Sequence, residues 1–212
     1  MAILSLDQAQ SLTRPFHDLW LEAHNYAEGK FWGYGHHDPE GFLALGQLSR
    51  ANFLHDQVVR RISVQGAATL QSTIGLGFFA QVLPGDCGDA LVRFKLLNDE
   101  LRTSNHDSDQ QDALDLHEYS EEAMGVLSLS GISGPPTLLT CGYQVKADES
   151  GISRVLIVCH YKRDLVYYYD VRDAAEGGGS AEVLLLPHIG SPPEATVRSR
   201  PKPEQETPES SE

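Results

Sequence analysis

RVLIVCHYKRDLVYYYDV (residues 154–171) places two runs of β-branched and aromatic residues on either side of one short polar segment. Such runs favour β-strands, and a polar break of this length favours an antiparallel hairpin. TLLTCGYQV (137–145) precedes this pair and AEVLLLP (181–187) follows it, each separated from it by polar or glycine-rich residues. The C-terminal half of the chain is therefore predicted to be an antiparallel β-meander. Because VLIV (155–158) is apolar at every position, we expect both faces of the sheet to be covered.

The N-terminal part of the chain has helical periodicity instead. Apolar residues recur every three or four positions over residues 15–29 and 39–62, and Asp38 followed by Pro39 has the pattern of a helix N-cap and first turn. The same periodicity predicts a third helix over residues 88–102. These elements indicate an α+β fold in which N-terminal helices pack on a C-terminal antiparallel β-meander.

The predicted elements fill one α+β domain, residues 1–187. Residues 188–212 are dense in proline, glutamate, serine and threonine and offer almost nothing to bury. We expect them to form a disordered, acidic and proline-rich tail.

The composition favours a soluble protein of the cytoplasm. Three cysteines are too few for a disulfide framework, which favours a reducing, intracellular compartment, and the first residues lack the features of a secretory signal. The most apolar stretch, residues 66–83, is interrupted by polar residues and falls short of the roughly 20 residues that a membrane span requires. The net charge of −14 repels phosphate backbones. We therefore expect neither membrane nor nucleic-acid binding.

One candidate for chemistry is Cys87, in LPGDCGDAL (83–91) at the start of the predicted third helix. The N-terminus of a helix stabilises a thiolate and so activates a nucleophilic cysteine. A cysteine that opens a helix ahead of a strand meander resembles the layout of papain-like and transglutaminase-like cysteine hydrolases. That resemblance implies a histidine early on the strand that follows, where this chain has Ser153 and Arg154. His160 is then the remaining candidate for the base.

The histidine-rich stretch suggests a second kind of site. The first helix is expected to end at Gly29, and the chain to turn back through FWGYGHHDPEGF (31–42). This reversal would bring His36 or His37 towards His24 and Glu28, which share one helix face. Two helix ligands with one loop ligand suit zinc or iron. The alternative is structural, with the aspartate of this stretch as a helix cap and the histidines as loop residues.

Because no catalytic set is complete, the main functional prediction is a binding or regulatory protein that acts through protein–protein contacts. Residues 98–122 carry nine carboxylates against one arginine, a net charge of −8. Either this segment or the C-terminal tail is expected to steer a basic protein partner. No cofactor is expected, because the glycine pattern at residues 75–80 reaches Pro84 before a dinucleotide-binding helix is long enough to pack on a sheet. A cysteine-dependent hydrolase or acyltransferase that uses Cys87 remains the alternative.

Overall fold

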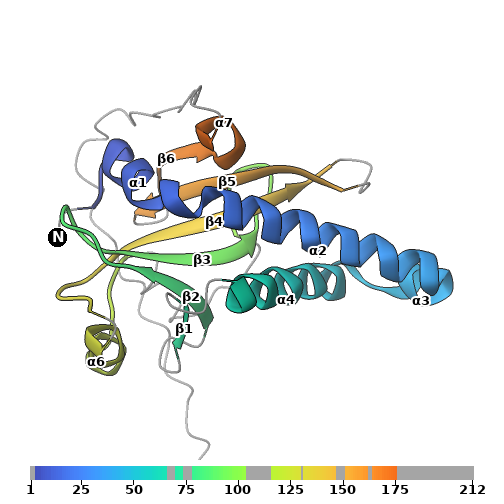
Figure 1. Cartoon of the computed structure of the whole chain (residues 1–212), viewed down its shortest axis with the longest axis horizontal. Coiled ribbons are helices and arrows are strands. Elements are labelled where there is room, and N and C mark those ends of the chain that lie inside the picture. Colours follow the sequence, from blue (N-terminus) through green and yellow to red (C-terminus); the bar gives the residue numbers. More distant parts are fainter. Residues whose placement is uncertain are drawn as a thin grey trace, which may run out of the picture.

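The computed structural model of the chain describes residues 3–65, 70–73, 78–103, 116–129, 131–146, 151–161 and 164–175. Its centre is a six-stranded sheet whose strands lie side by side in chain order (Figure 1). The strands are β1 (Leu70–Thr73), β2 (Phe78–Leu83), β3 (Ala90–Leu96), β4 (Thr137–Val145), β5 (Ile152–Tyr161) and β6 (Asp164–Asp170). Neighbouring strands are antiparallel except for β3 and β4, which run parallel.

The predicted α+β fold and its C-terminal meander are confirmed. β4, β5 and β6 pair in succession, with Ile157 opposite Cys141 on one side and opposite Tyr169 on the other. The predicted strand at residues 181–187 and the predicted tail at residues 188–212 lie outside the described residues, and the extent of the single domain stays a prediction.

Five helical segments precede the sheet in the described part of the chain: α1 (Leu6–Thr13), the 3-10 turn η1 (Arg14–Phe16), α2 (His17–His37), α3 (Pro39–Ala44) and α4 (Gln47–Gln65). Figure 1 shows α2 crossing one face of the sheet and continuing beyond its edge, where α4 runs back beside it. Arg61 on α4 pairs with Glu22 on α2, and its guanidinium lies 5.0 Å from the centre of the Tyr26 ring. The two helices form a hairpin that projects from the sheet.

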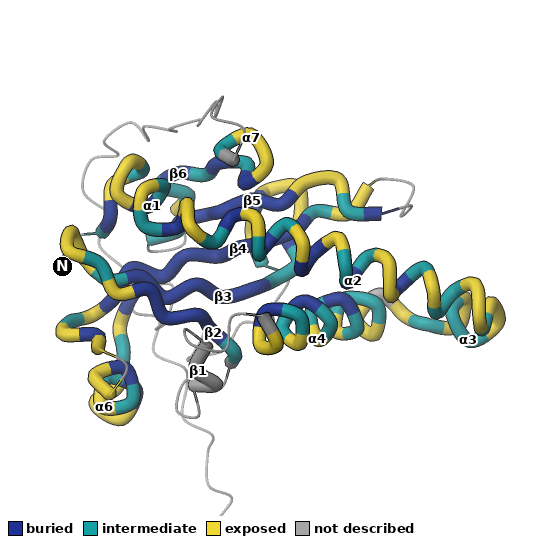
Figure 2. The backbone as a smooth tube through the Cα atoms, in the orientation of Figure 1, coloured by how far each residue is buried: buried dark blue, intermediate teal, exposed yellow. Residues whose placement is uncertain are grey.

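The main core lies between α2 and the sheet. Trp20, Ala23 and Ala27 recur at helical spacing and are fully buried. The Trp20 ring meets Phe94 edge-on at 6.2 Å between centroids, and its Nε1 donates a hydrogen bond of 2.8 Å to Gln81 Oε1. Figure 2 shows the burial running along β3, β4 and β5, whereas the projecting end of α2 and α3 is mostly exposed or half-buried. Burial of apolar area against the sheet is thus what fixes the direction of α2.

The opposite face of the sheet is covered as well, as the apolar strands predicted. α6 (Glu121–Leu129) buries Ala123 and Leu127 against Val82, Leu91 and neighbouring residues of the sheet. A second cluster on the sheet joins Leu97, Leu101, Leu156 and Val158.

The short helix α7 (Val171–Ala175) follows β6 and packs against α2. Among the described residues no helix is both long enough and apolar enough to cross a membrane.

The prediction of a helix over residues 88–102 is wrong, because Ala90–Leu96 is strand β3. β3 is an inner strand, and its first five residues are all buried, including those on both sides of the sheet. A strand covered on both faces loses the alternation of apolar and polar residues that identifies strands, so a helical spacing arises by coincidence. Even Arg93 is buried, with its Nε donating to Thr140 Oγ1 at 2.9 Å.

The prediction that the first helix ends at Gly29 is also wrong. α2 continues through Gly29 to His37, so FWGYGHHDPEGF begins as helix rather than as a reversing loop. The buried stripe of α2 includes Ala27 before the glycine and Phe31 after it. The burial of this stripe in the core outweighs the low helix propensity of glycine. The cap prediction is confirmed, since Asp38 Oδ1 accepts from the Gly41 amide at 3.0 Å. The second predicted helix is divided between α3 and α4, which are separated by residues 45–46.

Candidate ligand-binding groove

The three predicted metal ligands, His24, Glu28 and His36, all lie on α2. Twelve positions separate the two histidines, which at 1.5 Å per residue is about 18 Å along the helix axis. His24 is fully buried with Nδ1 2.7 Å from the carbonyl oxygen of Trp20, whereas Glu28 Oε1 accepts from the Ile152 amide at 3.1 Å. The structure does not bring the set together, and in the part of the chain that it describes no three His, Cys, Asp or Glu side chains are grouped to hold a metal ion.

Cys87 lies in the turn between β2 and β3, where its side chain is exposed. No helix begins there, so the helix N-terminus that was expected to stabilise its thiolate is absent. His160 lies on β5, and the intervening strand β4 puts the backbones of β3 and β5 about 10 Å apart. The carbonyl oxygen of His160 is 2.9 Å from Nε2 of His117. The structure therefore does not assemble the predicted cysteine and histidine into a dyad.

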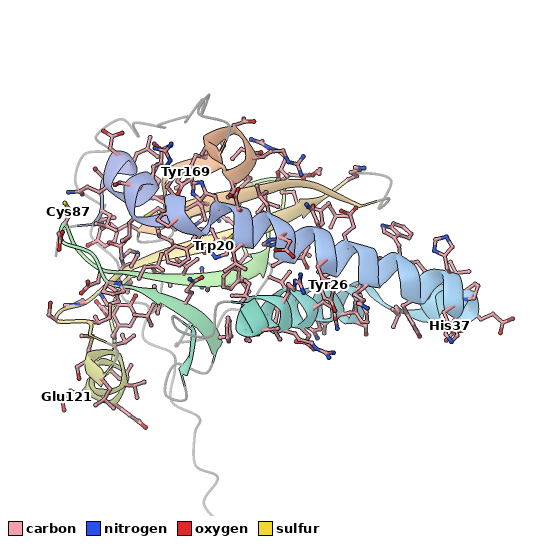
Figure 3. All side chains as sticks on the ribbon, viewed as in Figure 1. Trp20, Tyr26, His37, Cys87, Glu121 and Tyr169 are labelled. Carbon is pink, nitrogen blue, oxygen red and sulfur yellow. The ribbon has the colours of Figure 1, made fainter. Side chains whose placement is uncertain are left out.

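Cys87 does, however, line a groove between the N-terminal segment and the β2–β3 turn. The groove has a volume of about 590 Å³. One wall comes from Leu4, α1 and η1, and the other from the turn, which Figure 3 marks by the label of Cys87. The lining residues are Leu4, Asp7, Gln8, Ser11, Leu12, Pro15 and Phe16 on the first wall, and Pro84, Gly85, Asp86, Cys87 and Gly88 on the second.

Two glycines let the turn approach the N-terminal wall closely. A Cβ on Gly85 would stand 2.8 Å from Leu12 Cδ1, and a Cβ on Gly88 would stand 3.1 Å from Leu4 Cδ2. Gly88 also has φ of +129°, a backbone conformation that glycine adopts without strain. The Gly88 amide donates to the Gly85 carbonyl at 3.1 Å, and the Gly85 amide donates to Asp89 Oδ1 at 3.1 Å. The turn is thus fixed by its own hydrogen bonds and by contact with two leucines.

The N-terminal wall is tied to strands far along the chain. The Leu4 amide donates to Thr137 Oγ1 at 3.1 Å, which attaches the segment before α1 to the start of β4. At the other end of α1, Thr13 Oγ1 is 2.5 Å from the hydroxyl of Tyr169 on β6. Ser5 begins α1 with a capping box, in which Ser5 and Gln8 exchange side-chain and backbone hydrogen bonds. Both ends of the helix are therefore held, and the shape of the groove is determined by the tertiary fold.

The surface of the groove is largely apolar and carries negative charge. Leu12, Pro15, Phe16 and Pro84 provide partly or fully exposed apolar surface, while Leu4 is buried at its base. Two exposed carboxylates, those of Asp7 and Asp86, belong to opposite walls, and none of the lining residues is lysine, arginine or histidine. Such a surface suits a ligand that carries a positive charge beside an apolar group.

Sequence reasoning missed this groove because it did not predict α1. The signal was present in Ser5–Leu6–Asp7–Gln8, which matches the capping-box pattern of a helix start, and the structure contains that capping box. The contact between α1 and a turn some eighty residues later has no such local signal. Neither a protein-family model, nor a curated protein, nor a solved structure matches this chain.

Proposed function

We propose that this protein binds a partner protein by taking up a short basic and apolar segment of that partner in the groove between α1 and the β2–β3 turn. One observation carries the proposal: a single groove combines an apolar surface with Asp7 and Asp86 on opposite walls and has no basic lining residue. A lysine or arginine of the ligand would lie near the carboxylates, and a neighbouring proline or aliphatic side chain would lie on the apolar surface.

The size and exposure of the groove support a peptide ligand. Its volume of about 590 Å³ falls within the roughly 300–1,000 Å³ of ligand-binding sites. Eight of its twelve lining residues are exposed, so the groove is open to solvent along its walls. An enclosed small-molecule site buries most of its ligand, whereas a peptide places only some side chains in the site. Phe16 offers a partly exposed aromatic ring, the kind of surface on which proline-rich peptides dock, and Pro15 and Pro84 add exposed apolar surface beside it.

The charge of the whole chain supports a basic ligand. A net charge of −14 attracts a basic segment from a distance, and carboxylates at the groove orient it on arrival. Because both carboxylates are exposed, most of their effect is on the rate of association and on salt dependence, and the apolar contacts limit the rate of release.

The cysteine-hydrolase alternative has lost its main support. Its premise was a helix that begins at Cys87, and β3 takes the place of that helix. We therefore propose a binding role for the groove, in which Cys87 is a wall residue.

A peptide-selection experiment tests this function. The full chain is incubated with a randomised library of blocked hexapeptides, retained peptides are sequenced, and their dissociation constants are measured by fluorescence anisotropy at 50 and 300 mM salt. We expect the retained peptides to combine lysine or arginine with proline or an aliphatic residue and to bind more weakly at the higher salt concentration. Selection of acidic or uncharged sequences would contradict the proposal.

A charge-matched pair of variants locates the binding. Asp7→Asn with Asp86→Asn removes the two groove carboxylates, and we expect it to weaken binding about three- to tenfold, as the loss of exposed charge pairs does. Glu121→Gln with Glu122→Gln removes the same charge from exposed positions on α6, away from the groove (Figure 3). Equal weakening by both double variants would mean that the chain attracts basic peptides only through its net charge.

A further inference from the structure

We infer that residues 197–203 of this chain, VRSRPKP, occupy the groove and compete there with the partner segment. This inference rests on the proposed function, because it assigns an intramolecular competitor to the same site. Residues 197–203 lie outside the described residues, so the case for them is made from their sequence, their distance along the chain and the charge of the groove.

Charge singles out this segment. Arg198, Arg200 and Lys202 are three of the sixteen lysines and arginines of the chain, and no acidic residue interrupts residues 195–203. In a chain with a net charge of −14, a stretch with three positive charges is complementary to a groove that carries two carboxylates and no base. The match is the one that the proposed function requires of a partner segment.

The apolar residues of the segment match the groove as well. Val197, Pro201 and Pro203 alternate with the basic residues, so each positive charge has an apolar neighbour within two positions. Prolines favour an extended backbone and present their rings to an apolar surface at little cost in conformational entropy. The segment therefore has both chemical features that Pro15, Phe16 and the two carboxylates would recognise.

The connection is long enough. The last described residue, Ala175, ends α7, which packs against α2, the helix that continues from α1 and η1. Twenty-two positions separate Ala175 from Val197, and at about 3.3 Å per residue they span up to roughly 70 Å. A compact domain of this size is about 40 Å across. The segment can thus reach the groove from α7, and a ligand on the same chain has an effective concentration of the order of 1 mM.

Peptide binding to the full chain tests the competition. The probe is fluorescein-labelled VRSRPKP, and its affinity is measured for the unmodified chain and for the variant Arg198→Ser, Arg200→Ser, Lys202→Ser. We expect the variant to bind the probe about tenfold more tightly, the factor for a competitor at about 1 mM with an intrinsic dissociation constant near 0.1 mM. The charge-matched control replaces three exposed bases outside the groove, Lys30, Arg60 and Arg172, by serine. Tightening of equal size in the control would overturn the inference, because it would reflect net charge alone.

Crosslinking shows where the segment lies. A benzophenone side chain introduced at Ser199 is activated in the full chain, and the products are mapped by mass spectrometry. We expect crosslinks to residues 4–16 or 84–88, and a lower yield of these crosslinks when Asp7 and Asp86 are replaced by asparagine. Crosslinks confined to the acidic helix α6 would overturn the inference.

The two proposals fail in different ways. If library peptides bind in the groove but VRSRPKP does not, or if the probe binds the unmodified chain and the tail variant equally, the intramolecular competitor is excluded and the peptide-binding function stands. If no basic library peptide binds even to the tail variant, the proposed function itself is contradicted.

Discussion

The hydroxyl groups of Thr13 and Tyr169 lie 2.5 Å apart, although 156 positions separate the two residues in the chain. Both residues are buried, and Nε2 of His17 is 3.1 Å from the same threonine oxygen. Thr13 also donates to the Ala9 carbonyl at 2.8 Å, so its hydroxyl joins α1, α2 and β6 at one point. The N-terminal wall of the groove is therefore fastened to β6, which ends the sheet in the part of the chain that the structure describes.

Replacing Tyr169 by phenylalanine should test this fastening. The change removes one buried hydrogen bond and keeps the ring, so we expect the free energy of unfolding to fall by about 1–2 kcal/mol in urea denaturation. Tyr26→Phe is the matched control, because in the described part of the chain the Tyr26 hydroxyl has no hydrogen-bond partner and its ring contacts survive the change. Equal stability of the two variants would show that the Thr13–Tyr169 contact contributes nothing.

Stability should fall in mild acid because of His24. This side chain is fully buried, and burial lowers the pKa of His24 to about 4. The unfolded imidazole, with a pKa near 6.5, takes up a proton before the folded one does. The free energy of unfolding should therefore be at its full value above about pH 7 and fall as the pH drops from 6.5 to 4, by up to about 3 kcal/mol.

The variant His24→Leu should lose most of this pH dependence in urea denaturation at pH 7.5, 5.5 and 4.5. Some slope should remain, because burial also lowers the pKa of His17, partly offset by the neighbouring Asp18. The control is His37→Leu, at an exposed position on the same helix. A slope in His24→Leu as steep as in the control would contradict the assignment to His24.

Two glycines on α2 should respond differently to alanine. No atom lies within 4 Å of a Cβ built on Gly33, so Gly33→Ala should raise the free energy of unfolding by about 0.5–1 kcal/mol through helix propensity. A Cβ on Gly35 would stand 3.1 Å from the Phe42 ring, so Gly35→Ala should gain less or lose stability. Thermal and urea unfolding measure both, and an equal gain at the two positions would argue against the contact with Phe42.

The cap at Asp38 should matter through its carboxylate oxygen. Asp38→Ala removes the acceptor for the Gly41 amide, and we expect a loss of about 1 kcal/mol in the free energy of unfolding. Asp38→Asn keeps an acceptor oxygen and should retain most of that stability. A loss of the same size in both variants would point to the charge rather than to the cap.

The three cysteines should differ in their reactivity towards a thiol reagent. Cys87 is exposed, whereas Cys141 and Cys159 are buried, and burial raises the pKa of both, that of Cys159 to about 12. Ellman's reagent should therefore react with one thiol in the native protein and with three after denaturation. In Cys87→Ser the native count should drop to zero; a remaining fast thiol would mean that a buried cysteine becomes accessible by local opening.

The parts of the fold that were predictable have local signals. Ile157 and Tyr169 belong to apolar runs bounded by turn residues, which is why the hairpin of β5 and β6 was predicted. Asp38 followed by Pro39 is likewise a local pattern, and its cap formed. In each case the residues that determine the structure lie within a few positions of one another.

The parts that were not predictable depend on distant partners. Arg93 lies in a buried strand because it donates a hydrogen bond to Thr140 and because β4 pairs with β3. Neither interaction can be inferred from the sequence of residues 88–102 alone. The helix continues through Gly29 because Phe31, beyond the glycine, is buried in the main core. The groove needs Leu12 to meet Gly85, a contact that only the folded chain creates.

The attachment of α1 at both ends has a consequence during synthesis. Leu4 is anchored by Thr137 of β4 and Thr13 by Tyr169 of β6, so α1 is synthesised before either of its partners. At roughly 5–20 residues per second, α1 waits about 8–30 seconds for residue 169. A nascent chain is therefore unable to complete the N-terminal wall of the groove until β6 has been synthesised.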